Sequence, residues 1–205
     1  MMNIRLSVKG VLRTFKHYMP SPLPYLRGDK DGRGEISRRD YLKKMYLILS
    51  VTVVAVVLLD LITKACIDSN MSLHESVVVI GGFLNITYVR NPGAAFSFLA
   101  TASPGFRSVF FLTVTVLAII LVLYYIAKSK TDESLMIFAL SLIMSGALGN
   151  FIDRVRLGEV IDFIDVHLGA YHWPAFNVAD SAITVGAFIM LFVLFKRPKE
   201  HENSP

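Results

Sequence analysis

Four apolar stretches, each close to the length that crosses a lipid bilayer, dominate this sequence. The first three, Met45–Thr63, Val109–Ala127 and Leu135–Ile152, contain 19, 19 and 18 residues. The fourth, Ser181–Phe195, contains 15 residues and reaches full length if its helix begins near Pro174. Because a membrane-spanning helix needs about 20 predominantly apolar residues, we expect an all-α membrane protein with four transmembrane helices. The predicted spans are, in round terms, residues 45–66, 107–127, 135–153 and 176–196.

The composition supports a membrane protein and excludes several other classes. Hydrophobic residues make up 54% of the chain and charged residues only 18%, whereas soluble domains average about 45–50% and about 25%. A water-soluble globule, a disordered chain and a fibrous protein are therefore excluded. Cys66 is the single cysteine in the sequence, which rules out a disulfide scaffold and a cysteine-based metal cluster.

The basic residues predict how the chain is oriented in the membrane. Eleven of the 21 lysines and arginines lie in residues 1–44, and the loop 128–134 and the tail after Phe195 are also basic. The connections 68–106 and 153–180 contain more carboxylates than basic residues. Since basic segments stay in the cytoplasm, both termini are expected to be cytoplasmic and both of these connections extracytoplasmic. The net charge of +5 has the same explanation, so no nucleic-acid partner is expected.

The chain therefore divides into a basic cytoplasmic N-terminal extension, a transmembrane domain and a cytoplasmic tail. These parts are residues 1–44, 45–198 and 199–205. Within the extension, residues 29–40 resemble an EF-hand calcium loop, but Arg33 stands among the ligand positions and Asp40 replaces the bidentate glutamate. We interpret this stretch as a solvated basic segment rather than a calcium site.

The extracytoplasmic segment 68–106 is the part expected to contain β-structure. Val77–Val89 is rich in β-branched residues and is interrupted by the pair Gly81 and Gly82. This pattern predicts a small β-hairpin outside the membrane.

Polar residues collect at the outer ends of the predicted spans, where their cost makes them candidates for function. Asp60 and Lys64 are four residues apart and share one helix face; they form either a structural ion pair or part of a site. Asn91 and Gly93 belong to Arg90–Ser97, a small-residue segment that fits either an ordinary turn or close contact with a ligand.

A third polar group, Asn150, Asp153 and Arg154, lies on one side of the third span at its outer end. Such a cluster is more than a helix needs for anchoring, which favours a functional role. It follows Ser145 and Gly149, a pair of small residues that favours close helix packing.

Several aspartates at the outer membrane face suggest acid–base chemistry. Two carboxylates in apolar surroundings cannot both ionise easily, so they share a proton, and one serves as base and the other as acid. This arrangement is what an aspartic peptidase requires. The residues alone leave open which two of the candidates meet. The candidates are Asp153, Asp162, Asp165 and Asp180.

Two other functions fit the same residues less well. A proton-coupled transporter also uses intramembrane carboxylates, but carriers usually bind near the midplane rather than at one edge. A polyprenyl-phosphate phosphatase needs several convergent basic residues, and the outer connections contain few. No HExxH, GxSxG or phosphate-binding glycine loop occurs, and the five histidines lack zinc-ligand spacing.

Four motifs in order complete the pattern: NPGAAFS, GALGNFIDR, VIDFID and FNVADS, each at the predicted outer face. From about Asp60 to Ser181 the sequence resembles the lipoprotein signal peptidase (signal peptidase II) family. The resemblance implies an aspartic endopeptidase of the bacterial cytoplasmic membrane, sensitive to globomycin. It would cut prolipoprotein signal peptides on the amino side of a diacylglyceryl-modified cysteine.

The resemblance also assigns roles to individual residues. Asp162 and Asp180 match the family's catalytic pair. The residues matching its substrate-binding and supporting positions are Asn91, Gly93, Asn150, Asp153, Arg154, Asn177, Asp60 and Lys64. The resemblance implies neither a metal nor an organic cofactor. The expected partners are prolipoproteins and membrane lipids, and the chain is expected to act as a monomer with its site on the extracytoplasmic side.

Overall fold

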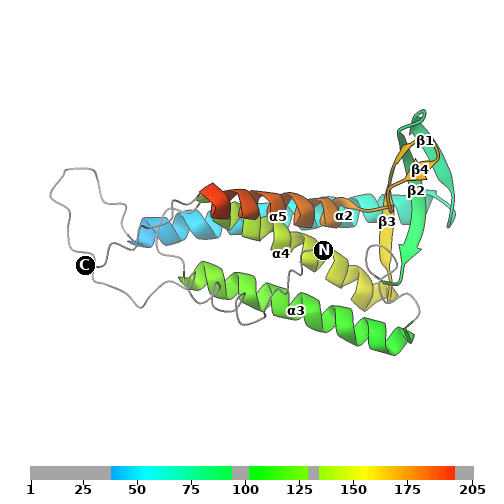
Figure 1. Cartoon of the computed structure of the whole chain (residues 1–205). Helices are drawn as coiled ribbons and strands as arrows, with labels where there is room; N and C mark the ends of the chain where they lie inside the picture. The colour runs from blue at the N-terminus through cyan, green and yellow to red at the C-terminus, as the bar shows by residue number, and fades with distance from the viewer. Residues whose placement is uncertain (1–37, 94–101, 129–133, 197–205) are drawn as a thin grey trace, which may run out of the picture.

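The computed structural model describes residues 38–93, 102–128 and 134–196 (Figure 1). The calcium-like stretch of the N-terminal extension lies outside this part of the chain, apart from its last three residues, which are helical. The tail beyond residue 196 and part of the segment around Ser97 also lie outside it.

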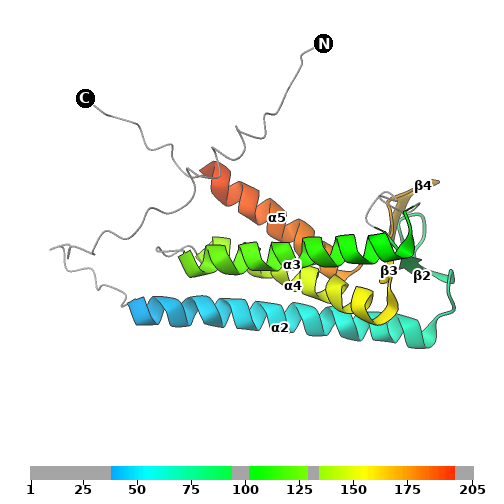
Figure 2. The same cartoon turned by 90° about the horizontal axis from the view of Figure 1, so that it is seen from below.

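The part of the chain that the structure describes contains four helices long and apolar enough to cross a membrane, which confirms the predicted number of spans. They are α2 (Arg38–Asn70), α3 (Pro104–Lys128), α4 (Ser134–Leu157) and α5 (Val178–Lys196). Their axes run in the same general direction, and the sheet lies across one end of the bundle (Figures 1 and 2). The first and third helices extend several residues beyond the predicted spans.

Helix α4 is the central element of the bundle. Of its most apolar window 61% is buried, against 11–17% for the other three helices. Small residues allow this packing: a Cβ on Gly186 of α5 would lie 2.6 Å from the carbonyl oxygen of Ala139, and a Cβ on Gly146 would collide with the carbonyl oxygen of Ala179. The backbones of α4 and α5 therefore approach more closely than larger side chains permit.

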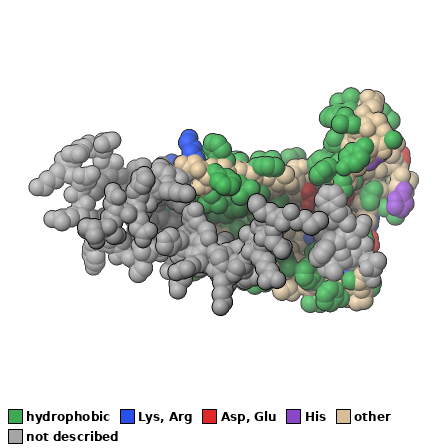
Figure 3. Space-filling model, viewed as in Figure 1, with side chains coloured by type: hydrophobic (Ala, Val, Ile, Leu, Met, Phe, Trp, Pro, Cys, Tyr) green, Lys and Arg blue, Asp and Glu red, His purple; other side chains and the backbone are tan. Residues whose placement is uncertain are grey.

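The outer surfaces of the other helices are apolar and exposed, as expected of surfaces that face lipid. Val54, Leu58, Leu121, Phe188 and Phe192 are each about half exposed or more. Figure 3 shows hydrophobic side chains on the helix surface and on the projecting end of the sheet. Aliphatic and methionine side chains fill the buried centre of the bundle. They include Met45, Val122, Met136, Ile137, Leu140 and Met144.

The described residues also form a four-stranded antiparallel sheet in the order β1-β2-β3-β4. Its strands are β1 (Ser76–Ile80), β2 (Leu84–Asn91), β3 (Val160–Leu168) and β4 (Tyr171–His172). The β1–β2 pair is the predicted hairpin. Strands β3 and β4 were not predicted, because β3 pairs with β2 from a segment about 70 residues earlier in the chain. The β-structure is thus not confined to residues 68–106.

Helix α5 begins at Val178, so the expected start of the fourth span near Pro174 is wrong. The side-chain oxygen of Asn177 accepts a hydrogen bond from the backbone N–H of Asp180 at 2.8 Å, which caps the helix. Phe176 instead exchanges backbone hydrogen bonds with Ile164 at 2.8 and 3.1 Å. The residues before Asn177 therefore continue the sheet and place the first turn of α5 beside β3.

The close α4–α5 contact predicts a strong effect of size at Gly186. Replacing Gly186 by valine is expected to lower the free energy of unfolding by about 1–3 kcal/mol, because the added atoms overpack a backbone contact. Thermal unfolding in detergent measures the change. The matched control is Gly105→Val, since a Cβ at Gly105 meets nothing within 4 Å. Equal losses in the two variants would contradict this account of the packing.

Candidate active site

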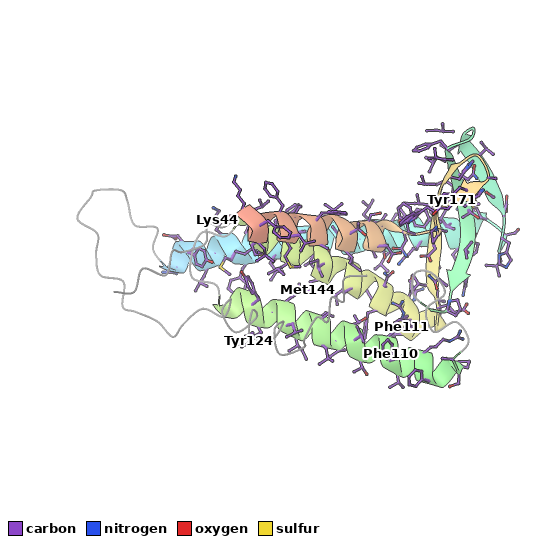
Figure 4. The ribbon with its side chains drawn as sticks, viewed as in Figure 1. Lys44, Phe110, Phe111, Tyr124, Met144 and Tyr171 are labelled. Atoms are coloured by element: carbon purple, nitrogen blue, oxygen red, sulfur yellow. The ribbon has the colours of Figure 1, made fainter. Side chains whose placement is uncertain are left out.

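A cavity of about 770 Å³ lies where α3, α4 and α5 meet the sheet. Its walls are mostly apolar and come from all three helices, while Asn91, Asp162 and Asp180 contribute polar groups. Figure 4 places Phe110 and Phe111 toward the end of α3 nearest the sheet, and Lys44 near the opposite end of the bundle. The cavity is therefore an apolar space with a polar end near the sheet.

Asp162 lies on β3 and is 2% exposed. Its two carboxylate oxygens accept hydrogen bonds from separate amides: Asn91 Nδ2 at 2.9 Å and Asn177 Nδ2 at 2.7 Å. Burial raises the pKa of Asp162 to about 7, with a further contribution from the charge of Asp180. Asp162 therefore holds its proton at pH values below about 7 and loses it above them.

Asp180 occupies the first turn of α5 and lines the same cavity. Its Oδ1 accepts a hydrogen bond from Asn150 Nδ2 at 2.8 Å. The same N-cap interaction with Asn177 that starts α5 fixes the backbone of Asp180. A helix N-terminus favours a negative charge at this position, so Asp180 is suited to carry the charge of the pair.

The asparagines that hold the two aspartates also contact each other. Asn177 Nδ2 lies 3.2 Å from Asn150 Oδ1 while donating to Asp162. The Oδ1 of Asn150 also accepts a hydrogen bond from Lys64 Nζ at 3.1 Å. Because Lys64 donates to that oxygen, the amide group of Asn150 is oriented with its nitrogen toward Asp180. One polar network therefore joins both carboxylates.

The network rests on a buried ion cluster formed by Lys64 with Asp60 and Asp153. Lys64 Nζ lies 2.7 Å from Asp60 and 2.9 Å from Asp153, and none of the three side chains is more than 2% exposed. Asp60 also accepts the backbone N–H of Ala179 at 2.9 Å, and Asp153 accepts that of Ile161 at 3.3 Å. The cluster thus connects α2 and α4 to the starts of α5 and β3, which is more than an ion pair within one helix does.

Arg154 and Gly93 contact each other at the edge of the cavity. Arg154 Nη2 donates to the carbonyl oxygen of Gly93 at 3.2 Å, and its guanidinium carbon lies 4.7 Å from the centre of the Phe111 ring. The N–H of Gly93 donates to Asn91 Oδ1 at 2.9 Å, which leaves the amide nitrogen of Asn91 directed to Asp162. Arg154 therefore ties α3, α4 and the end of β2 together.

The structure brings all ten sequence-predicted site residues into this one region. It also distinguishes the four candidate aspartates by their contacts. Asp153 is engaged by Lys64. Asp165 points elsewhere: its carboxylate lies 2.8 Å from His172 Nδ1 and 3.0 Å from Asn85 Nδ2. Although burial opposes the change, these hydrogen bonds lower the pKa of Asp165. Of the four, Asp162 and Asp180 are the two that line the cavity.

Several cavity-lining residues were not predicted from the sequence. Phe111, Thr115 and Thr184 line the wall from α3 and α5, and no pattern in the sequence distinguishes them from other span residues. Trp173 and Phe176, which fit an interfacial aromatic belt, also line the cavity. Within the described residues no group of three or more His, Cys, Asp or Glu side chains is arranged to hold a metal ion.

Comparison with known proteins identifies the family. The family model for signal peptidase (SPase) II matches residues 52–196, more than half of the chain. The chain belongs to the signal peptidase II family. These are aspartic peptidases of the membrane that remove signal peptides from lipoproteins, so the peptidase hypothesis is favoured over the transporter and the phosphatase.

Individual members of the signal peptidase II family match over nearly their whole length. The lipoprotein signal peptidase of Geobacter sulfurreducens is 52% identical over 164 residues, which cover 80% of this chain and 100% of that one. That of Syntrophus aciditrophicus is 48% identical over 159 residues, 78% and 99% of the two chains. A solved bacterial membrane enzyme is similar in fold, with a TM-score of 0.68 and 38% identity over 77% of this chain and 93% of that chain.

The ion cluster predicts a large and specific loss of stability on removing its cation. Lys64→Met would leave two buried carboxylates without a counter-ion and is expected to lower the free energy of unfolding by about 3–5 kcal/mol. The matched control is Lys43→Met on the same helix, whose 3.6 Å pair with Asp40 is exposed. That change is expected to cost less than about 1 kcal/mol. Chemical denaturation of the purified protein in detergent compares the two, and a Lys64→Met variant as stable as Lys43→Met would contradict the assignment.

Proposed function

We propose that Asp162 and Asp180 are the catalytic pair that activates water for peptide hydrolysis. The observation that carries the proposal is their placement: both line one cavity, and each is held by a different asparagine. Within the described residues neither carboxylate forms an ion pair with a lysine or arginine, in contrast to Asp60 and Asp153. The pair is therefore available to exchange protons with a substrate.

Asp162 and Asp180 have distinct roles in the proposed reaction. Asp180 removes a proton from the water, whose oxygen attacks the scissile carbonyl carbon, while Asp162 donates its proton to the carbonyl oxygen. The tetrahedral intermediate then collapses: the C–N bond breaks as the leaving nitrogen takes the proton held by Asp180, and the carbonyl re-forms as one hydroxyl returns its proton to Asp162. The products are a signal peptide with a new carboxyl end and a lipoprotein with a free amino group.

The neighbouring polar residues position this pair. Asn91, Asn150 and Asn177 donate to the carboxylates and fix their orientation. Arg154 supplies a positive charge at the cavity edge, where negative charge develops on the carbonyl oxygen. Lys64, Asp60 and Asp153 hold the asparagines and the helix ends in place without contacting the substrate.

The shape of the cavity suits a prolipoprotein. Its apolar wall on α3 and α5 would receive the apolar signal segment, with the peptide bond before the modified cysteine reaching Asp162 and Asp180. The peptide must be extended there, because a helix hides its carbonyl groups in hydrogen bonds. The diacylglyceryl chains would lie in the surrounding lipid, against the exposed apolar helix surfaces.

The charge distribution supports the proposed orientation. Lys43, Lys44 and Lys196 lie at the helix ends that are far from the sheet. Positively charged ends stay in the cytoplasm, so the sheet and the cavity would face outward from the bacterial cytoplasmic membrane, with both termini inside. The proposed enzyme acts as a monomer, since all the residues assigned to the reaction come from one chain.

Removing either carboxylate is expected to abolish cleavage. Asp162→Asn and Asp180→Asn should each lower kcat by about 10³-fold or more, because an amide neither accepts nor donates the required proton. A synthetic prolipoprotein, lipidated or not at its cysteine, reports cleavage by gel shift with purified enzyme in lipid.

The matched control is Asp165→Asn, on the same strand but hydrogen-bonded to His172 and Asn85. It should cleave the lipidated substrate like the wild type. Processing by Asp162→Asn or Asp180→Asn would contradict the assigned pair, and equal cleavage of the unlipidated peptide would contradict the substrate class.

The raised pKa of Asp162 predicts the pH dependence of the reaction. Its protonated form is the active one, so kcat/KM is expected to be maintained below the pKa of about 7 and to fall as the pH rises through it. An Asp162 with an ordinary pKa of 3.8 would instead be ionised across the neutral range. Initial rates between pH 5 and pH 9 test this, and a rate that stays constant through pH 8 would contradict the proposed roles.

A further inference from the structure

Strand β2 contains one residue more than β3 at the point where it approaches the site. Ile86 pairs with Ile164, but Val89 pairs with Asp162, so three steps along β2 match two along β3. This is a β-bulge at Thr87 and Tyr88. Side chains alternate between the two faces of a strand, so an additional residue moves every later side chain of β2 to the opposite face.

The bulge decides which face of the sheet Asn91 occupies. With it, Asn91 pairs with Val160 and lies on the same face as Asp162, to which its amide donates at 2.9 Å. Continuing the register of Leu84 and Val166 without the bulge would place Asn91 opposite Glu159, on the other face. The hydrogen bond between Asn91 and Asp162 therefore depends on the bulge.

Tyr88 is the residue that fixes the bulge. Its backbone N–H donates to Glu75 at 2.9 Å, and its carbonyl oxygen accepts from the N–H of His74 at 2.8 Å. His74 has a φ of 69°, an unfavourable conformation that this contact helps to hold. The Tyr88 side chain is 4% exposed, although it stands beside an exposed edge strand.

The hydroxyl of Tyr88 joins two charged residues from different elements. It donates to Asp68 in the last turn of α2, and it accepts from Arg90 Nε at 2.9 Å and Nη2 at 2.8 Å. Arg90 Nη2 also lies 2.9 Å from Asp68. Burial and the hydrogen bond to Asp68 raise the pKa of Tyr88, so the hydroxyl keeps its proton and remains a donor.

We propose that Tyr88, with Asp68 and Arg90, is a positioning cluster that fixes the β2 bulge and thereby delivers the Asn91 amide to Asp162. The cluster anchors the bulge to the end of α2, and Arg90 is the residue directly before Asn91. None of its three members lines the cavity, so it acts through Asn91 and not on the substrate. The inference rests on the proposed catalytic role of Asp162.

The test compares Tyr88→Phe, Asn91→Ala and the double variant in the lipidated-substrate assay. Tyr88→Phe is expected to lower kcat by about 10-fold or more with little change in KM, because a small displacement of a catalytic group is costly. The hydrogen bond from Asn91 favours ionised Asp162, so its loss should move the alkaline limb of the pH profile to higher pH in both single variants. The double variant should be no slower than Asn91→Ala alone.

The charged groups that face Asp162 are the same in all these variants, so a shift of the limb reports on Asn91. They are Asp180 from α5, Lys64 from α2 and Arg154 from α4. Thr87→Val is the matched control, because it removes a hydroxyl of the same bulge. That hydroxyl donates to the carbonyl oxygen of Glu75 at 3.2 Å and to no other group of the described residues. It should leave kcat and the limb unchanged.

A wild-type rate and pH profile in Tyr88→Phe, or losses that multiply in the double variant, would overturn the positioning role. If the rate of Tyr88→Phe falls by the same factor at every pH, with no shift of the alkaline limb, the positioning role is also overturned, because misfolding alone has that effect. If Tyr88→Phe does not fold, Arg90→Gln removes the donors to the hydroxyl without emptying a buried site, and the same shift is expected. The two proposals fail in different ways. Full activity of Asp162→Asn would refute the catalytic assignment. If Asp162→Asn is inactive but Tyr88→Phe has the activity and pH profile of the wild type, only the positioning cluster is refuted.

Discussion

The buried contact of Lys64 with Asp60 and Asp153 is the interaction on which the rest of the site depends. A lysine that is 2% exposed is stable only if its charge is matched and its donors are used. Here two carboxylates and the oxygen of Asn150 surround it. The carboxylates in turn accept backbone N–H groups at the starts of α5 and β3. One charge therefore positions the two elements that carry Asp180 and Asp162.

This arrangement separates the groups that hold the site from the groups proposed to react. The holding groups pair with one another in a buried ion cluster. Asp162 instead accepts hydrogen bonds from two amides and has no ion pair with a lysine or arginine of the described residues. Its pKa of about 7 follows from burial and from the nearby charge of Asp180. The outer surface of the bundle is apolar, and the proposed catalytic pair lies at the polar end of the cavity. Three asparagines donate to the two carboxylates, and the bulge in β2 places one of them, Asn91, beside Asp162 from a strand that is far away in sequence.

Much of this organisation could be predicted from the sequence, and the reasons differ between elements. The spans follow from the length of apolar runs, and the site residues follow from the cost of polar groups near lipid. The pairing of β3 with β2 could not be predicted, because it joins segments about 70 residues apart and depends on a bulge. The residues alone leave four aspartates as candidates, and the family resemblance singles out Asp162 and Asp180. The contacts that engage Asp165, with Asn85 and His172, are long-range or depend on the fold and could not be read from the residue pattern.

The central claim is that Asp162 holds the proton of the pair, and infrared difference spectroscopy of the carboxyl groups tests it most directly. The account predicts a protonated carboxyl band that disappears as the pH rises through about 7. This band should be missing in Asp162→Asn and retained in Asp165→Asn. A band that persists in Asp162→Asn, or a wild-type protein without any such band at pH 6, would contradict the account.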